Sequence, residues 1–251
     1  MPANYARFLI GRNRSLSANR HLGLVLSFVA GAINAGGFLA VKQYTSHVTG
    51  MVSSLADNTV LGQGDLITTA AVGVLAFLLG AMCCAVLVNI ARRQQLSSEF
   101  ALPLMVEAAL ILCFGLLGAR LALIEGLLVP LTVLLLCFIM GLQNAVVTKL
   151  SNKEIRTTHM TGIVTDLGIE LGKLFYWNVK RDPALHVRAD RERVAVLSGL
   201  LGCFLGGGIL GAVGFKYIGY ASTIPLALLL AAVAVVPALD DWQQRNRQGR
   251  A

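Results

Sequence analysis

The sequence predicts an all-α, polytopic membrane protein built from two related halves. Two observations carry this prediction: six long apolar stretches, and a polar motif that occurs twice. Of the 251 residues, 56% are hydrophobic and only 14% are charged, and the mean hydropathy is +0.70. A soluble domain has about a quarter of its residues charged. Most of this chain's surface must therefore face something other than water.

Six apolar stretches of about 20 residues are each long enough to cross a hydrocarbon core of about 30 Å as a helix. A helix satisfies its own backbone hydrogen bonds, which lipid requires of any spanning segment that is not a closed barrel. The predicted spans are 22–41, 66–90, 102–123, 127–148, 194–215 and 221–239.

The chain divides at these spans into four parts. Residues 1–21 form a polar, basic arm, which is followed by full spans and not by the short apolar stretch of a secretory signal. We expect repeat 1 over 22–125 and repeat 2 over 126–240, with a tail over 241–251. The arm and the tail are both expected on the cytoplasmic side.

A polar motif appears once in each repeat. The first repeat reads GAINAGG from Gly31 and TSHVTGMVSSL over 45–55; the second reads GLQNAVV from Gly141 and TTHMTGIVTDL over 157–167. Agreement over this many positions indicates an internal duplication. Farther on, FLLGAMCC (77–84) aligns loosely with GLLGCFLG (199–206). The equivalent pairs in the motif are Asn34 and Asn144, His47 and His159, Thr49 and Thr161, and Gly50 and Gly162.

Each motif leads into a helix-compatible but polar segment, at about 48–62 and 160–176. Fifteen helical residues reach only about 22 Å, too short to cross unaided. If neither segment crosses, 18 of the 21 Lys and Arg residues face the cytoplasm; if both cross, 14 do. Cytoplasmic connections are enriched in Lys and Arg, which favours six crossings. Eight spans in parallel repeats are the alternative.

Six crossings place three in each repeat, and an odd number forces the two repeats into opposite orientations. The fold class is then two inverted repeats, each with three spanning helices and one short polar re-entrant or interfacial helix. The first short helix would come from outside and the second from the cytoplasm. Interrupted helices that meet near the midplane of inverted repeats are a recurrent plan among transporters.

The Gly-x-x-Asn-Ala motif, followed by Thr-Gly at the head of a polar helix, resembles the YoaK-like family of bacterial inner-membrane proteins. The likeness runs from about residue 22 to 240, and its most specific part is the pair Thr49-Gly50 and Thr161-Gly162. The resemblance implies a multi-pass protein of the bacterial inner membrane, in a family without an assigned biochemical function. That family commonly has an acidic residue near the first-span Asn and an Asn after the first Thr-Gly, where this chain has Asn34 and Met51.

The paired motifs supply the candidate substrate-binding residues. Asn34 and Asn144 lie in apolar spans, where an amide either hydrogen-bonds across helices or binds a ligand. The Thr-Gly pairs either cap and pack their helices, or present two helix N-termini to a shared central cavity. Such N-termini favour anionic or carbonyl-bearing groups. The candidate set is Asn34, His47, Thr49, Gly50, Asn144, His159, Thr161 and Gly162.

Proton or cation coupling is the second expected role of polar residues. Asp166 lies four residues after Gly162, and His159 heads the same motif; an imidazole exchanges protons near neutral pH, although a histidine also serves as a hydrogen-bonded structural residue. Intramembrane carboxylates are functional candidates, but Glu107 lies near the start of its span, where it could extend to the interface. No metal site is expected, because the ligands are too few.

We therefore expect a transporter or channel for a small polar or anionic solute or ion. A membrane scaffold or regulatory protein is the alternative. An enzyme acting on a lipid-linked substrate is less favoured, because HExxH and GxSxG motifs are missing. No cofactor and no nucleic-acid partner are expected, since the net charge of +8 lies in short connections between spans. The basic linker before residue 193 favours anionic lipid headgroups, and glycines between Gly202 and Gly211 leave a homodimer open.

Overall fold

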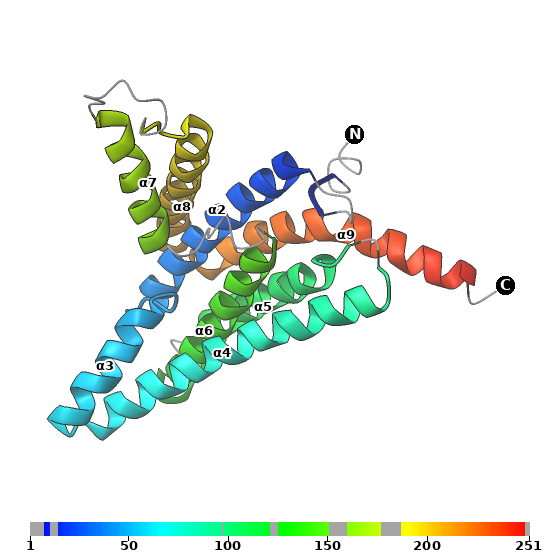
Figure 1. Cartoon of the computed structure of the whole chain (residues 1–251). Helices are drawn as coiled ribbons and strands as arrows, with labels where there is room; N and C mark the ends of the chain where they lie inside the picture. Colours follow the sequence, from blue (N-terminus) through cyan, green and yellow to red (C-terminus); the bar gives the residue numbers. More distant parts are fainter. Residues whose placement is uncertain are drawn as a thin grey trace.

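The computed structural model describes residues 8–10, 15–96, 98–120, 125–150, 160–176 and 187–248. Within these ranges the regular structure is helical throughout, as the sequence predicts. Figure 1 shows the arrangement. The elements are α2 (Leu16–Val41), α3 (Val48–Leu61), α4 (Gly64–Arg93), α5 (Ala101–Arg120), α6 (Glu125–Leu150), α7 (Met160–Phe175), α8 (Arg191–Tyr217), the 3₁₀ turn η3 (Gly219–Ser222) and α9 (Thr223–Gln248).

Six of these elements are long and apolar enough to cross a membrane: α2, α4, α5, α6, α8 and the η3–α9 segment. They coincide with the six predicted spans to within about three residues at the ends that the structure describes, with two exceptions. α2 begins at Leu16, before the predicted start at 22, and α9 continues to Gln248, past the predicted end at 239. The two polar helices, α3 with 14 residues and α7 with 16, are about 21 and 24 Å long and are not among them. The chain is a multi-pass helical membrane protein, and its described part also contains the shorter polar helices α3 and α7.

The two halves interlock through close contacts between glycines and backbone. α2 packs along α8, and α6 packs along α4. A Cβ added at Gly31 would overlap the carbonyl of Phe204, and one added at Gly141 would overlap the carbonyl of Phe77. Glycine lets two backbones approach closely in lipid, where packing drives helix association. Since Gly31 and Gly141 are equivalent in the duplicated motif, each half contributes the same packing device.

The reciprocal contacts fix how the later helices of the two halves correspond. Gly207 meets the carbonyl of Phe28, and Gly80 meets the carbonyl of Phe138. These contacts align FLLG at 77–80 with FLGG at 204–207. The correspondence therefore lies five residues later than the loose match at 199 suggested, because apolar letters alone do not say which glycine faces which carbonyl.

The equivalent helices α2 and α6 run in opposite directions. The Nε2 of Gln143 donates a hydrogen bond to the carbonyl of Leu26 at 3.2 Å, while Gly37 lies against Leu136. The contacting residue numbers on α6 therefore fall as those on α2 rise, so the two helices are antiparallel. α2 and α8, by contrast, run in the same direction, since Arg20 pairs with Glu192 near their starts.

These directions define two ends of the bundle. At the first, called here the Arg20 end, α2, α5 and α8 begin and α4 and α6 finish. At the second, the Lys42 end, α2, α5 and α8 finish and α4, α6 and α9 begin. The short helix α3 connects two helices at the Lys42 end, whereas α7 connects two at the Arg20 end (Figure 1).

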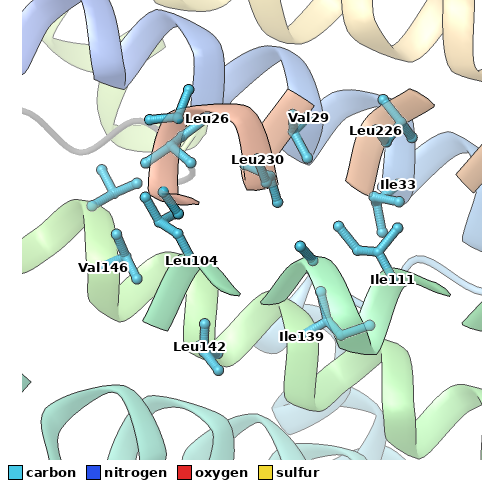
Figure 2. Close-up of a cluster of buried hydrophobic side chains, with 14 of the residues drawn as sticks. Leu26, Val29, Ile33, Leu104, Ile111, Ile139, Leu142, Val146, Leu226 and Leu230 are labelled. Carbon is cyan, nitrogen blue, oxygen red and sulfur yellow. The ribbon is translucent and has the colours of Figure 1, made fainter. Parts of the chain in front are cut away.

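The main apolar core lies where α2, α5, α6 and α9 meet. Figure 2 shows Leu26, Ile33, Leu104, Ile139 and Leu230 within it. α6 is the most buried of the long helices, while α4 and α8 expose rows of large apolar side chains, as lipid-facing helices do. In α8, Gly207 and Gly211 pack against α2, whereas Gly202 and Gly206 have open space beside them.

Candidate functional site

The short helix α3 directs its N-terminal end toward the interior of the bundle. Met51, in its first turn, lies beside Gly73 of α4 and is buried with Cys137 of α6. Gly73 is seven residues, about 10 Å of helix, from Gly80, where α4 crosses α6 closely. α3 then runs antiparallel to α4 and ends beside its start, at Gly62. Its N-terminus is therefore deeper in the bundle than its C-terminus.

α7 has the same relation to α8 at the opposite end of the bundle. Ile163, the counterpart of Met51, is buried with Leu197 and Leu200. Leu200 is four residues, about 6 Å, from Phe204, where α8 crosses α2. Each short helix thus points its N-terminus inward, α3 from the Lys42 end and α7 from the Arg20 end.

Among the residues that the structure describes, the two short helices pack on different long helices. α3 packs on α4 and α7 packs on α8, and neither short helix packs extensively on the other. Figure 1 shows them at separate ends. Asn34, Thr49 and Gly50 belong to the first half of the chain, and Asn144, Thr161 and Gly162 to the second; His159 lies outside the described residues.

A pocket of about 490 Å³ opens at the N-terminal end of α3. A volume in this range suits a small organic or inorganic solute. The walls come from the end of α2, the connection that follows, α3, and the first turns of α4. The polar part of the lining comprises Lys42, Gln43, Tyr44, His47, Ser54 and Thr69, together with the backbone of Gly50.

Lys42 occupies an unusual backbone conformation at this pocket. It caps the C-terminus of α2 with φ 56°, in the left-handed region, and its N–H donates to the carbonyl of Phe38 at 2.8 Å. Glycine or asparagine is the common residue in such a cap. The chain places a cation there instead, on the wall of the pocket. Strained backbone held at one position is typical of functional sites.

His47 and Thr49 lie at the head of α3, as the motif predicts. His47 is the N-cap residue, is exposed, and its side chain caps no backbone N–H. Its imidazole lies against Gly50, because a Cβ added there would be 2.6 Å from the His47 Nδ1. The position of the Thr-Gly pair in the first turn is confirmed, but Thr49 is within the helix and exposed.

Asn34 ties α2 to the connection that leads into α3. Its Oδ1 accepts a hydrogen bond from the Oγ of Ser46 at 2.7 Å. Next to Ser46, the side chain of Thr45 is buried, and its Oγ1 has no hydrogen-bond partner among the described residues. The loop before α3 therefore holds both an internal polar contact and a buried hydroxyl without a hydrogen-bond partner among the described residues.

The second motif shows different polar contacts. Asn144 is buried, and its Nδ2 donates to the carbonyl of Met140 in its own helix at 2.8 Å. Thr161 is exposed and Gly162 partly buried in the first turn of α7.

The acidic residues of α7 are tied to the start of α8. Asp166 pairs with Arg193 at 3.0 Å, with both side chains about half exposed. Glu170 is buried; Lys173 Nζ donates to its Oε1 at 2.8 Å, and the N–H of Asp190 donates to its Oε2 at 3.0 Å. The hydrogen bond from Lys173, and then the one from Asp190, lower the pKa of Glu170 below its usual value.

The sequence did not predict several of the residues that line the pocket. Lys42, Ser54 and Thr69 line the pocket, but none stands out by spacing. The only signal for Lys42 was its rarity, since it is one of three cations in the connections assigned to the outside. Across the residues that the structure describes, no three His, Cys, Asp or Glu side chains gather closely enough to hold a metal ion.

The chain matches the family described as "Protein of unknown function (DUF1275)" over residues 22–236. Because the match covers most of the chain, the protein belongs to this family. No curated protein and no solved structure matches it. The narrower likeness to YoaK-like proteins stays an expectation, and the family supplies no substrate.

Proposed function

We propose that this protein is a transporter or channel for a small polar or anionic solute, which binds first in the pocket at the head of α3. One observation carries the proposal: the pocket of about 490 Å³ has Lys42 and His47 in its lining, and no described lining residue is acidic. A scaffold would have no use for a polar pocket in this position.

The charge of this pocket favours groups that bear negative charge or a carbonyl oxygen. Lys42 supplies an ammonium group, and His47 supplies an imidazole. The first turn of α3 adds free backbone N–H groups and the positive end of its dipole. Anions bind readily at such helix N-termini. Charge-assisted hydrogen bonds from Lys42 would add to their affinity.

We further infer that the two Thr-Gly motifs line one conduit from its two ends. The antiparallel course of α2 and α6, and the inward N-termini of α3 and α7, support an inverted-repeat arrangement across the bilayer. Transporters of this plan bind their solute between half-helices and expose it to alternate sides. Asn34, His47, Thr49 and Gly50 then serve one side. Asn144, His159, Thr161 and Gly162 serve the other, with Asp166 as a coupling candidate.

The distribution of Lys and Arg supports a proposal for which end of the bundle faces the cytoplasm. Arg20, Arg92 and Lys149 lie at the Arg20 end, and the connections assigned to the outside carry only Lys42, Arg120 and Lys216. By the positive-inside rule, we propose that the Arg20 end and both termini are cytoplasmic; a location in the bacterial inner membrane is what the resemblance to YoaK-like proteins implies. Single cysteines in 57–65 and in 178–190, labelled with an impermeant reagent on intact cells, should react from opposite sides. Labelling from one side would refute the inverted arrangement.

Solute binding can be tested by thermal unfolding of the purified protein with inorganic phosphate, sulfate and small carboxylates. A ligand that binds only the native state stabilises it by about 2.7 kcal/mol at a hundred times its Kd. Lys42→Asn should abolish this shift, because it removes the ammonium group while Asn tolerates the left-handed backbone. Lys216→Gln, which removes another cation of the Lys42 end, is the matched control and should keep the shift.

Transport itself is tested in proteoliposomes loaded with the anion that gives the shift. His47→Ala and Thr161→Ala should each reduce uptake strongly while the unfolding temperature stays near that of the wild type, since both side chains are exposed. Binding without any flux would favour the scaffold or regulatory reading. Chemical turnover in detergent, without a gradient, would favour an enzyme.

A further inference from the structure

Glu107 is a carboxyl group sealed inside the helical bundle. It lies in α5, and its exposed fraction is 0%. Neither carboxyl oxygen has a hydrogen-bond partner among the described residues. Its position six residues into the span had suggested that the side chain could extend to the interface; α5 turns it inward instead, toward the core.

Other buried polar groups lie at about the same level of the bundle as Glu107, and one of them also has an atom without a hydrogen-bond partner among the described residues. Leu104 and Ile111, which flank it on α5, face the α6 segment between Ile139 and Val146 (Figure 2). Gln143 belongs to that segment, and its Oε1 also has no hydrogen-bond partner among the described residues. The buried thiol of Cys84, from α4, lies within electrostatic range of both Glu107 and Lys149.

The titratable and charged groups around this site are few. α9 has none between Thr223 and Leu239, and the 3₁₀ turn contributes only Tyr220, at the Lys42 end. Toward the Arg20 end, α6 contributes Lys149 and α4 contributes the thiols of Cys83 and Cys84 before Arg92 and Arg93. α5 itself carries no other ionisable group than Arg120 and Cys113. No cation is recorded in an ion pair with Glu107 in the part of the chain described.

This environment restricts the charge that Glu107 can carry. A buried carboxylate without a partner is strongly disfavoured, so in this conformation the group must hold a proton. A purely structural acid would donate that proton to a neighbouring acceptor, and none is within hydrogen-bonding distance among the described residues. Asp166 differs, because it is half exposed and already paired with Arg193.

We propose that Glu107 is a proton-binding site of this protein, whose occupancy changes with its conformation. This inference rests on the proposed transport function and names a coupling ion for it. The carboxylate takes up one proton from the solution at the Arg20 end, past Lys149, and returns it when the helices around α5 separate. No other bond is made or broken. A proton carrier in a membrane bundle has these properties: burial, few partners and nearby polar side chains.

The site can be tested without knowing the solute, by using dicyclohexylcarbodiimide, an apolar reagent that adds to protonated carboxylic acids. In the purified protein, peptide mass spectrometry should find the adduct on Glu107, and its rate should fall as the pH rises. Glu107→Gln should lose the adduct. Glu99→Gln, which alters the acid paired with Arg92 at the membrane edge, should keep it. An adduct that never forms on Glu107, or one whose rate ignores pH, would overturn the proposal.

Infrared spectroscopy gives a second readout that does not depend on reagent access. The carbonyl stretch of a protonated acid should be present in the wild type, fade at high pH, and be absent in Glu107→Gln. If Glu107→Gln does not fold, Glu107→Asp should shift this band in place of removing it. A wild-type spectrum without a titrating acid band contradicts the proposal.

Proteoliposome assays separate this inference from the transport proposal. With the anion identified by thermal unfolding, a pH gradient should drive accumulation in the wild type, and Glu107→Gln should lose that accumulation while keeping downhill exchange. Equal accumulation by both proteins would refute proton coupling and leave transport standing. A titrating Glu107 without any anion flux would refute transport and leave the proton site standing.

Discussion

The two short helices are built on the same backbone plan but differ in the polar groups that they carry. Both run outward along the next long helix, and both bury an apolar side chain of the first turn, Met51 in α3 and Ile163 in α7. Three positions farther along, Asp166 in α7 replaces its counterpart Ser54. Four beyond that, Glu170 replaces its counterpart Asn58.

Because of this difference, the buried polar side chain of α3 bonds within its own helix, whereas the acidic side chains of α7 bond to the start of α8. Asn58 is buried, and its Nδ2 donates to the carbonyl and the hydroxyl of Ser54, at 2.7 and 2.8 Å, within its own helix. Glu170 and Asp166 instead form bonds to Asp190 and Arg193 at the start of α8. α3 is thus joined to its neighbour chiefly by packing, beside an open pocket, while α7 is held by charged contacts. The two halves therefore share the placement of their short helices, but they differ in the polar side chains that those helices carry and in the bonds that these side chains form.

The largest expected effects test whether the two halves share one packing device. Gly31→Ala and Gly141→Ala should each destabilise the protein, because the added methyl overlaps the carbonyl of Phe204 or Phe77. Overpacking of this kind costs about 1–3 kcal/mol. Thermal unfolding in detergent measures both. The open site Gly206→Ala is the control and should change stability by less than about 0.5 kcal/mol. A large loss from only one of the pair would break the equivalence of the halves.

The hydrogen bonds that Glu170 accepts from Lys173 and Asp190 should make the contribution of α7 to the stability of the protein depend on pH. The bonds of Asn58, its counterpart in α3, should give no such dependence. Since its folded pKa is lowered, Glu170 contributes stability above the ordinary carboxyl pKa of about 4.3, and this contribution is lost as the pH falls through the folded value. Glu170→Gln should therefore lower the unfolding temperature at neutral pH, and the gap from wild type should close in acid. Asn58→Ala should lower it by an amount independent of pH. A gap that stays constant for Glu170→Gln would show that its charge contributes nothing.

The smallest effect should come from the ion pair between Asp166 and Arg193. Because both side chains are about half exposed, a double-mutant cycle with Asp166→Asn and Arg193→Gln should give a coupling of about 0.2–1 kcal/mol. High salt should weaken it. A larger, salt-insensitive coupling would mean that this pair is far better shielded than its exposure indicates. Uptake by Asp166→Asn in proteoliposomes tests separately whether the residue also couples transport.

Much of the fold could be predicted from sequence because its determinants are local. Hydropathy gave the six long helices, and the Thr-Gly motifs gave the starts of α3 and α7. The candidate site was harder. Lys42 reaches the pocket only through the left-handed turn that ends α2, and Thr69 reaches it only because α4 folds back beside α3. Neither position carries a periodic or spacing signal.

By itself, the sequence determined the spanning segments, the duplication and the polarity of the two short helices, since each depends on neighbouring residues or on a repeated motif. The tertiary structure alone decided which glycine meets which carbonyl, that Asp166 is paired with Arg193, and that Glu107 is buried with no hydrogen-bond partner among the described residues. Those outcomes depend on side chains from helices far apart in the chain. Whether a polar group faces lipid, water, a cation or an apolar core is settled only when those helices pack.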